Sequence, residues 1–587
     1  MSIQVDVIKA KDGTDIFQLL QDGKKYMLNS TYHPVAEAER FIKQADDLVP
    51  RSVLAVFGFG NGIFPEAIAK ECMKREISLV FYEPCREIME CLKEQLELQG
   101  FCNEYHCRLA SLQDWEQGEY LYGLEEFPLL LEEVLCHQNM TKVYCIALPK
   151  YKELFPEEYK NFREAVNYRI TRLQSNAYTS KLFGHLTVRN NIQNLRYLPD
   201  SYCGDSFVNL FPEELPAIIV SAGPSLEKNI HVLKEAKGKA FILCVDTAMR
   251  NVLKAGIVPD MMISIDSRKA LDLFDDQRIR GIPLAGMPDM KAEVLDKLSG
   301  SPVIFFSSQN NYVRKLYHMA GHEIPDFRKG GSVATSAYSF CQYMGFKRVI
   351  LVGQDLALTG DQMYAGEQKL DMKIFNREVR PVEDVYGGTV YTTTDYYFYL
   401  KWFEQSIAAY PEMEVIDATE GGAKITGSKI MTLREAIDTY GMDACDIPAL
   451  LASVKPAFDE QQRQFIKKDV AESKRRIANL IVRLRQGIED AERAIALARK
   501  GTATQEQYNR INKKLTELCD YYEDMDEWYL VQYEIDATVL DEYMNLFNKF
   551  GDKTVEEAYG DMKAYFNYLL QAAKQVKELY DELEWEE

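Results

Sequence analysis

The stretch of residues 217–230, AIIVSAGPSLEKNI, most constrains the fold, because an apolar run breaks at Gly-Pro and restarts at once with helical spacing. Residues 217–220 suit a buried strand, while Leu226, Ile230 and Leu233 recur along one helix face. Glycine lets a backbone approach a ligand closely, and the first N–H groups of a helix lack internal partners. The stretch therefore predicts either a phosphate-binding loop or an ordinary strand-to-helix turn.

Short apolar runs alternate with helical segments from Pro216 onward. The predicted strands are residues 217–220, 240–245, 261–265, 303–306 and 348–352. Such alternation is typical of a parallel sheet covered by helices on both faces, whose ligands lie beyond the carboxyl ends of the strands. We therefore expect an α/β fold with a Rossmann-like central domain.

Acidic residues follow several of these strands. Asp246 follows the second strand, Asp266 the third and Asp355 the last. Residues 329–335, KGGSVAT, precede a further predicted helix and place a second glycine-rich helix start at the same edge. The combination favours a nucleotide site, and the alternative is that the aspartates are helix caps and turn residues.

Length, charge and hydropathy limit the class of protein. The 587 residues predict several domains, and the net charge of −21 argues against binding a nucleic-acid backbone while allowing a nucleotide in a local cradle. The sequence has no long apolar segment and no secretory signal. We expect a cytoplasmic protein that binds neither nucleic acid nor membrane.

The 12 cysteines include no C-x-x-C pair and mostly lie in apolar runs. Buried free thiols are therefore expected rather than disulfides or zinc ligands. We predict no metal site.

A second Rossmann-like pattern opens the chain. An apolar strand within residues 51–62 runs into glycines, and the next strand, residues 78–82, ends in Glu83. This pattern resembles the nucleoside-binding loop of S-adenosylmethionine-dependent methyltransferases. Because Phe59 and Phe64 crowd the loop, we expect the fold to be kept without that ligand.

The last part of the chain is predicted to be all-α, with apolar residues at three- and four-residue steps and a helix stop at Gly501. The predicted domains are a Rossmann-like N-terminal domain at 1–150, a helical connector at 151–205, a central catalytic domain at 206–455 and a C-terminal helical domain at 456–587.

The central motifs resemble the motility accessory factor family of bacterial flagellin glycosyltransferases. The resemblance rests on GPSL at 223–226, DTA at 246–248, Pro259-Asp260, Asp266, Gly330-Gly331-Ser332, FKRVILVGQD at 346–355, YGGTVY at 386–391, the aromatic helix at 396–402 and VIDATEGGAK at 415–424. The loop and the VGQD run are also similar to bacterial sialyltransferases that use a CMP-activated donor, although Ser221 replaces the first glycine of their loop.

The resemblance implies an inverting transfer of a nonulosonic acid, such as pseudaminic or legionaminic acid, from CMP to serine or threonine of flagellin. Flagellum assembly and motility would depend on this transfer. The residues implied in nucleotide binding are Ser221, Gly223, Pro224, Ser225, Asp246, Thr247, Gly331, Ser332, Thr335 and Tyr364. N–H groups at helix starts can stabilise the leaving phosphate without a metal, so we expect no cofactor beyond the CMP-sugar donor.

The sequence does not identify the general base. The sialyltransferases use a histidine, but no histidine follows His322 here, so the candidates are Asp355, Asp266 and His322. Flagellin is the expected partner, and its docking is a second role for C-terminal tyrosines such as Tyr521, Tyr522, Tyr529 and Tyr533. The sequence does not decide whether the chain forms a homo-oligomer. The alternatives are a nucleotide-dependent diphosphokinase of the pterin type, which the central domain also resembles, and a non-catalytic flagellar export factor.

Overall fold

The computed structural model describes residues 3–43, 48–93, 96–111, 131, 134–135, 139, 142–327, 330–358, 379–501, 503–539, 542, 546 and 553–583. The chain forms two compact units, of which the first comprises Met1–Leu182 and Val539–Tyr565 and the second Phe183–Thr538 and Phe566–Glu587. The central sheet and most of the C-terminal helices thus belong to one unit. The four-domain division stays a prediction.

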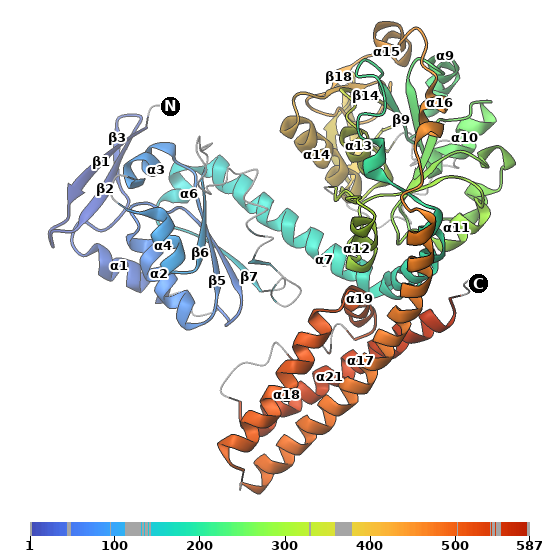
Figure 1. The fold of residues 1–587 in the computed structure, drawn as a ribbon. Helices are drawn as coiled ribbons and strands as arrows, with labels where there is room; N and C mark the ends of the chain where they lie inside the picture. The colour runs from blue at the N-terminus through green and yellow to red at the C-terminus, as the bar shows by residue number, and fades with distance from the viewer. Residues whose placement is uncertain are drawn as a thin grey trace. The chain divides into compact units, whose positions relative to one another are not determined.

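Two sheets form the first unit (Figure 1). The antiparallel sheet has the order β1-β2-β3, formed by Ile3–Lys9, Asp15–Gln21 and Lys24–Met27. The parallel sheet has the order β6-β5-β4-β7, formed by β4 (Val53–Phe57), β5 (Ser78–Glu83), β6 (Cys107–Ser111) and β7 (Val143–Ala147). Every residue of β4 is buried, as expected for a parallel strand with both faces covered.

The helices of this unit include the start of α7, which runs on into the second unit. They are α1 (Pro34–Lys43), α2 (Ile63–Lys74), α3 (Arg86–Lys93), α4 (Leu98–Glu104), α6 (Tyr151–Leu154) and α7 (Pro156–Gln193). The start of α21 (Val555–Asp581), as far as Tyr565, also belongs to this unit.

A parallel nine-stranded sheet forms the core of the second unit, in the order β18-β17-β14-β9-β10-β11-β12-β13-β8. Its strands are β8 (Tyr202–Cys203), β9 (Ala217–Val220), β10 (Phe241–Val245), β11 (Met261–Ser264), β12 (Leu284–Gly286), β13 (Val303–Phe305), β14 (Arg348–Val352), β17 (Glu414–Asp417) and β18 (Lys429–Ile430). The α/β fold with a parallel central sheet is confirmed.

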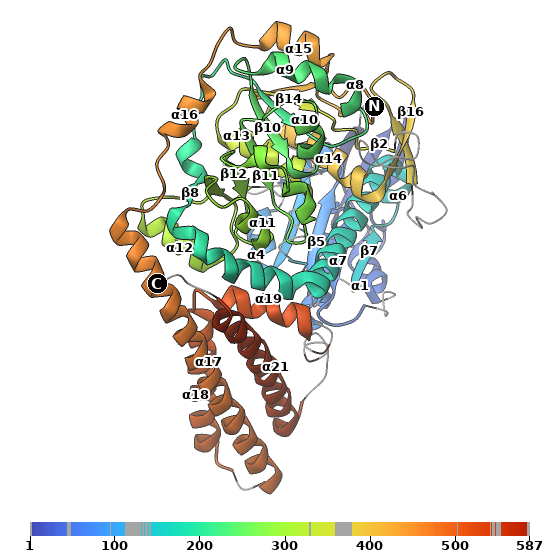
Figure 2. The same ribbon diagram turned by 90° about the vertical axis from the view of Figure 1, so that its right-hand side faces the viewer.

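Helices surround this sheet (Figure 2). They are α8 (Leu226–Asn229), α9 (Leu233–Ala236), α10 (Met249–Lys254), α11 (Ala292–Lys297), α12 (Asn311–Met319), α13 (Val333–Tyr343), α14 (Thr394–Ala409), α15 (Leu433–Tyr440) and α16 (Ile447–Ser453). The 3-10 helices are η1 (Asn194–Asp200), η2 (Gly204–Phe207), η3 (Ile230–Val232), η4 (Asp246–Ala248), η5 (Leu271–Phe274) and η6 (Gln277–Ile279). A small antiparallel pair joins β15 (Val379–Glu383) to β16 (Thr389–Thr393).

The C-terminal region is helical, as predicted. Its helices are α17 (Glu460–Lys500), α18 (Gln505–Glu523), α19 (Trp528–Thr538) and α21 (Val555–Asp581). Helix α17 ends at Gly501 with a left-handed φ of 63°, and a capping box between Thr504 and Gln507 starts α18. In the described part of the chain, no helix is long and apolar enough to cross a membrane.

Salt bridges and an aromatic contact connect this helical region to the rest of the second unit. Arg463 Nη1 lies 3.0 Å from Asp200 Oδ1, and Lys315 Nζ lies 2.5 Å from Asp526 Oδ2. The ring centroids of Tyr317 and Phe458 lie 5.0 Å apart. The start of α17 and the turn before α19 therefore pack against the central domain.

Most of the tyrosines expected to dock flagellin have structural contacts. Tyr522 is 2% exposed and its ring centroid lies 4.4 Å from that of Trp528. Tyr529 and Tyr533 pack on each other with ring centroids 4.8 Å apart, in the field of Asp289 of the central domain. Tyr522 is therefore buried within the helical region, whereas docking of flagellin on the half-buried Tyr529 and Tyr533 stays a prediction.

Candidate functional site

The loops after β9 and β14 are joined at the carboxyl edge of the large sheet. The Ser221 N–H donates to Val352 O at 2.8 Å, and the Gly223 N–H donates to Gly353 O at 2.8 Å. The Ser221 hydroxyl donates to Gln354 Oε1 at 2.7 Å. The two loops that the sequence predicted to meet therefore form one hydrogen-bonded structure.

The Asp355 side chain accepts hydrogen bonds from the loop after β9 and holds that loop in place. Its Oδ2 accepts the Ser225 N–H at 3.0 Å, and its Oδ1 accepts the Ser225 hydroxyl at 2.5 Å. Asp355 is 3% exposed, and its backbone carbonyl accepts the Ala423 N–H at 2.7 Å. Because both carboxylate oxygens are used to position Ser225, Asp355 has the geometry of a positioning residue and not that of a solvent-facing base.

The physical reason for Gly223 differs from the expected one. A Cβ at this position would lie 2.1 Å from Asp355 Oδ1 and 2.5 Å from Gly353 O. The glycine is therefore needed for packing between the two loops, whereas the sequence suggested that it admits a ligand. The buried Pro224 and Ser225 lead into a helical segment, as predicted, which consists of α8 (Leu226–Asn229), η3 (Ile230–Val232) and α9 (Leu233–Ala236) rather than one regular α-helix.

Asp417 is a candidate site residue that sequence reasoning missed. It ends β17 opposite Leu351 of β14 and is 1% exposed. Its Oδ1 accepts the Thr419 N–H at 3.1 Å, whereas its Oδ2 has no hydrogen-bond partner among the described residues. Burial, with a smaller contribution from nearby Asp355, raises the pKa of Asp417 to about 6. Its place at a strand end, within VIDATEGG, was the signal that could have found it.

Asp246 follows β10, two places from β14 in the sheet, and forms a salt bridge with Lys269. Its carboxylate accepts the Ser264 hydroxyl at 2.6 Å, accepts the Thr247 N–H at 2.6 Å, and lies 2.6 Å from Lys269 Nζ. Burial raises the pKa of Asp246, and the Lys269 ammonium opposes that rise. The sequence predicted Asp246 and Thr247 but missed Lys269, whose side chain is 11% exposed.

The other two candidate bases lie apart from Asp355. Asp266 follows β11, three places from β14 in the sheet, which corresponds to about 14 Å. Its Oδ1 accepts the Arg268 N–H at 2.9 Å, and its side chain is 35% exposed. His322 contacts Asp205 beside β8, six places from β14, or about 29 Å. The structure therefore does not bring the three candidate bases together.

The second glycine-rich helix start is present at α13. The Thr335 N–H donates to Ser332 Oγ at 3.2 Å and the Ser332 N–H donates to Thr335 Oγ1 at 3.2 Å, which is a capping box. A Cβ on Gly331 would lie 3.1 Å from Tyr399 Cε1. Because α13 runs back to the start of β14, its N-terminus lies at the carboxyl edge of the sheet. Tyr364 lies outside the described residues.

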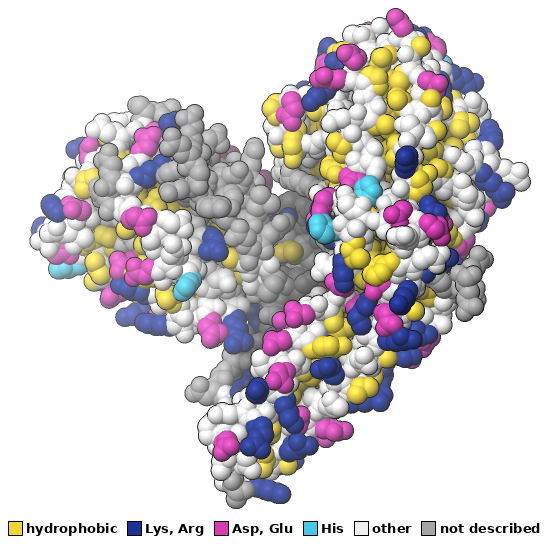
Figure 3. Space-filling view, viewed as in Figure 1, with side chains coloured by type: hydrophobic (Ala, Val, Ile, Leu, Met, Phe, Trp, Pro, Cys, Tyr) yellow, Lys and Arg dark blue, Asp and Glu magenta, His cyan; other side chains and the backbone are white. Residues whose placement is uncertain are grey.

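A cavity lies at the opposite, amino edge of the sheet. It has a volume of about 460 Å³ and is lined mainly by apolar side chains such as Val258, Ile282 and Leu451. Figure 3 shows hydrophobic side chains gathered on the surface of the central domain around α16. None of the predicted site residues lines this cavity.

The N-terminal glycine loop is closed by the protein itself. Glu83 is fully buried and accepts the Phe59 N–H at 2.7 Å, the Gly60 N–H at 3.0 Å and the Tyr151 hydroxyl at 2.7 Å. A Cβ on Gly58 would lie 2.7 Å from the Tyr151 ring. Tyr151 packs against the loop, and the Glu83 carboxylate uses its hydrogen-bonding capacity within the protein.

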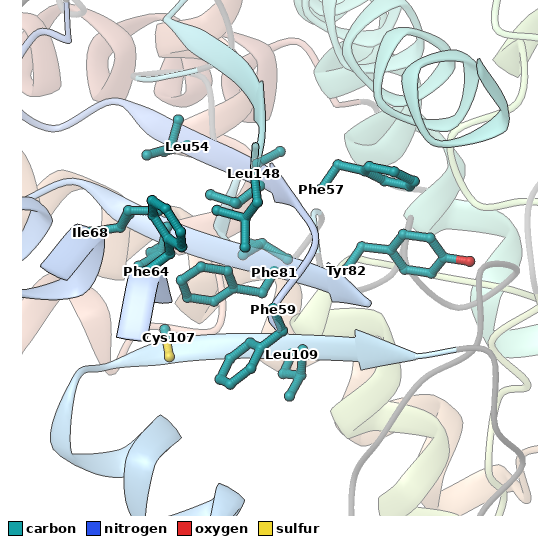
Figure 4. Packing of buried hydrophobic residues seen from close by; sticks show 14 of the residues in the cluster. Leu54, Phe57, Phe59, Phe64, Ile68, Phe81, Tyr82, Cys107, Leu109 and Leu148 are labelled. Carbon is teal, nitrogen blue, oxygen red and sulfur yellow. The ribbon is translucent and has the colours of Figure 1, made fainter. Parts of the chain in front are cut away.

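Phe59 does not crowd this loop in the way the sequence suggested. Its ring points into the core beside Phe81 and Leu109 (Figure 4), with its centroid 5.2 Å from that of Phe81. Phe64 is also in the core. The absence of S-adenosylmethionine binding stays a prediction, now resting on Tyr151.

Three comparisons with known proteins bear on this geometry. The family model for 6-hydroxymethylpterin diphosphokinase MptE-like proteins matches residues 189–361. An uncharacterized protein of Treponema pallidum (strain Nichols) is 31% identical over 126 residues, which are 20% of this chain and 55% of that protein. The chain thus spans about half the length of this relative.

The structure is similar to that of a MAf glycosyltransferase from Magnetospirillum magneticum AMB-1. The TM-score is 0.61 at 14% identity, and the match covers 99% of this chain and 93% of the other. The resemblance found in the sequence is confirmed for the fold. The MptE-like match ends at residue 361 and leaves out β17, whereas the glycosyltransferase likeness extends over 99% of the chain.

Proposed function

We propose that the chain is a glycosyltransferase that moves a nonulosonic acid from CMP to serine or threonine hydroxyls of flagellin. The observation that carries the proposal is the likeness to the MAf glycosyltransferase, which extends over 99% of the chain and so over both units. The sequence motifs at 223–226 and 346–355 point the same way. Flagellin would be modified before its export, so we place the protein in the cytoplasm.

In this proposal the nucleotide lies over β17, β14 and β9. The Oδ2 of Asp417, unpaired among the described residues, would accept a hydrogen bond from a ribose hydroxyl or from the cytosine amino group. Lys228 lies beside the loop, with its Nζ donating to Glu420 O at 2.8 Å, and a cation there suits the phosphate. Together with backbone N–H groups, Lys228 would stabilise the charge that develops on the departing CMP.

Asp266 is the base that the geometry favours. Transfer forms a bond between the acceptor oxygen and the anomeric carbon, breaks the bond from that carbon to the phosphate oxygen, and passes the hydroxyl proton to a base. Asp355 is buried under Ser225, and His322 is about 29 Å away by sheet position. Asp266 is half-exposed, and about 14 Å from β14 leaves room for the sugar between it and the nucleotide.

The test combines binding with transfer. CMP should raise the melting temperature without added Mg²⁺ or Mn²⁺, because a ligand at about 100 times its Kd stabilises the folded state by about 2.7 kcal/mol. CMP-activated pseudaminic or legionaminic acid and flagellin should give a glycosylated product by intact mass. We expect Asp266→Asn to lower transfer at least ~10-fold with CMP binding kept. An unchanged transfer rate would remove Asp266 from the mechanism.

The second candidate is a diphosphokinase acting on a pterin alcohol, and the MptE-like match over residues 189–361 favours it. Such an enzyme would need ATP with Mg²⁺ and would have no use for flagellin. Stabilisation by ATP with Mg²⁺ but not by CMP would support this candidate. Stabilisation by neither ligand would favour a non-catalytic export factor.

A further inference from the structure

Three residues with metal-ligating side chains meet at the last strand of the large sheet. Cys203 ends β8, Asp205 lies in the turn of η2 that follows, and His322 lies in the segment after α12. One ligand atom from each of them, a thiol sulfur, a carboxylate oxygen and an imidazole nitrogen, lies within 4.8 Å of the others. His322 Nδ1 lies 2.9 Å from Asp205 Oδ1.

The backbone around the three residues is fixed without help from a bound ion. A Cβ on Gly204 would lie 3.2 Å from Pro325 Cγ, so the two segments pack closely. The Ser307 N–H donates to Pro325 O at 2.7 Å, and the Glu323 N–H donates to Asp205 Oδ2 at 2.8 Å. A site here would be preformed, which lowers the cost of ordering its ligands on binding.

We propose that Cys203, Asp205 and His322 form a binding site for a zinc-type divalent cation. Zn²⁺ binds thiolate, imidazole and carboxylate ligands, and a fourth ligand completes its tetrahedral coordination. Mg²⁺ and Ca²⁺ prefer sites made of oxygen ligands, so the sulfur and nitrogen ligands favour Zn²⁺. Cys203 is fully buried, whereas Asp205 and His322 have 20% and 24% of their side chains exposed. The exposed side provides a path of entry and room for water as the fourth ligand.

The surface is consistent with this entry path. Figure 3 shows histidine and acidic side chains together on the face of the central domain that carries α12. Among the described residues, no other group of three such side chains comes as close together. The sequence could not reveal the site, because Cys203 and His322 belong to different, distant segments.

The ion would add a further connection between two segments that already pack together. Among the described residues, strand β8 has two residues and pairs with β13 alone, so the sheet itself supplies few of the hydrogen bonds that hold it at the edge. A metal would tie this strand to the connection that leads from α12 to α13. The site lies about 29 Å, by sheet position, from the loops at β14, so it takes no part in the proposed transfer and does not depend on it.

The experiment uses the untagged full chain, stripped with EDTA and then exchanged into buffer without chelator. Zn²⁺ binding is measured by competition with a chromophoric chelator and by elemental analysis after desalting. Co²⁺ loading is followed by absorption, because a thiolate ligand gives a sulfur-to-cobalt charge-transfer band. We expect one equivalent of metal, the thiolate band, and a higher melting temperature with Zn²⁺.

The variants are His322→Gln and Cys203→Ser, with His318→Gln and Cys341→Ser as matched controls. His318 is an exposed histidine close in sequence to His322, and Cys341 is a buried thiol in α13. Loss of one ligand should weaken Zn²⁺ binding at least ~10-fold, since loss of even the supporting partners of a ligand costs that much. The controls should bind as the wild type does.

Two results would overturn the proposal. One is a wild-type protein that retains no Zn²⁺ and shows no thiolate band with Co²⁺, which would leave the three residues as a hydrogen-bonded cluster. The other is an unchanged Zn²⁺ affinity in His322→Gln. That variant is at a partly exposed position where glutamine can still donate to Asp205, so it tests the site even if Cys203→Ser fails to fold.

Discussion

Replacing Asp417 with asparagine should make the protein more stable at neutral pH while weakening its hold on CMP. In the folded state this carboxyl group is 1% exposed, and burial raises its pKa from 3.8 to about 6. A raised pKa means that folding disfavours the charged form. The protonated Asp417 carboxyl group therefore stabilises the folded protein relative to the charged form. This contribution to the free energy of unfolding is fully present below the unfolded pKa of 3.8 and is lost as pH rises through about 6.

The size of the effect follows from the same shift. A rise from 3.8 to about 6 corresponds to a change of at most about 3 kcal/mol in the free energy of unfolding. The asparagine side chain carries no charge, so the variant should lack this pH-dependent loss. The free energy of unfolding of the Asp417→Asn variant, minus that of the wild type, should therefore increase by up to about 3 kcal/mol when the pH is raised from 4 to 7.5.

The assay is urea denaturation across this pH range, with Asp438→Asn as control. Asp438 lies exposed on α15, so its substitution controls for the loss of a surface carboxylate. A variant at position 417 whose stability differs from the wild type by the same amount at pH 4 and pH 7.5 would refute the pKa argument.

Ligand binding supplies an independent readout for Asp417. If its Oδ2 accepts a hydrogen bond from the nucleotide, the amide should cost about 1.5–3 kcal/mol of CMP binding, or roughly 10- to 100-fold in Kd. Isothermal titration calorimetry with CMP measures the Kd of the variant and of the wild type. Gain of stability together with loss of affinity is the pattern of a residue that is kept for binding at a cost in stability. Unchanged CMP affinity would show that Asp417 does not contact the nucleotide.

Three further substitutions test the remaining geometry. Gly223→Ala should destabilise the fold by about 1–3 kcal/mol, because its Cβ would meet Asp355, and normal unfolding with lost CMP binding would contradict this. Lys269→Met should cost about 3–5 kcal/mol by leaving Asp246 buried without its cation, and a second change, Asp246→Asn, should restore much of that loss in a double-mutant cycle. Glu83→Gln should lower the melting temperature without changing CMP affinity, and altered affinity would link the N-terminal loop to the site.

The sequence predicted the strands that read as apolar runs, and it missed strands of the same length that do not. Strand β9 reads as an unbroken apolar run because parallel strands are covered on both faces. Strand β12 is Leu-Ala-Gly and β17 is Glu-Val-Ile-Asp, so neither is an unbroken run of large apolar residues. The missed strand β17 is also the one that carries Asp417.

Contacts between distant segments explain the errors at the site. The sequence showed that Gly223 and Asp355 follow strands, and so that they share an edge of the sheet. It could not show that the carboxylate turns inward to Ser225, because that depends on how tightly the two loops pack. For the same reason, the sequence left Asp355 and His322 as equal candidates for the base, although they lie at positions six strands apart.

In each of the two glycine loops of the chain, a buried carboxylate accepts backbone N–H groups. The loops differ in whether a buried carboxylate oxygen nearby is left without a hydrogen-bond partner. In the first unit, Glu83 accepts backbone N–H groups of its loop, and the Tyr151 hydroxyl completes its hydrogen bonding. In the second, Asp355 accepts the Ser225 N–H, but the neighbouring Asp417 keeps one buried oxygen without a partner among the described residues. A buried polar oxygen left unpaired costs about 1–3 kcal/mol unless something else pairs it. At the N-terminal loop this cost does not arise, because the Tyr151 hydroxyl donates to Glu83. Near the loop after β9 it does arise, because Asp417 Oδ2 has no partner among the described residues. A ligand that donates a hydrogen bond to this oxygen would remove the cost, which favours the second loop as the binding site.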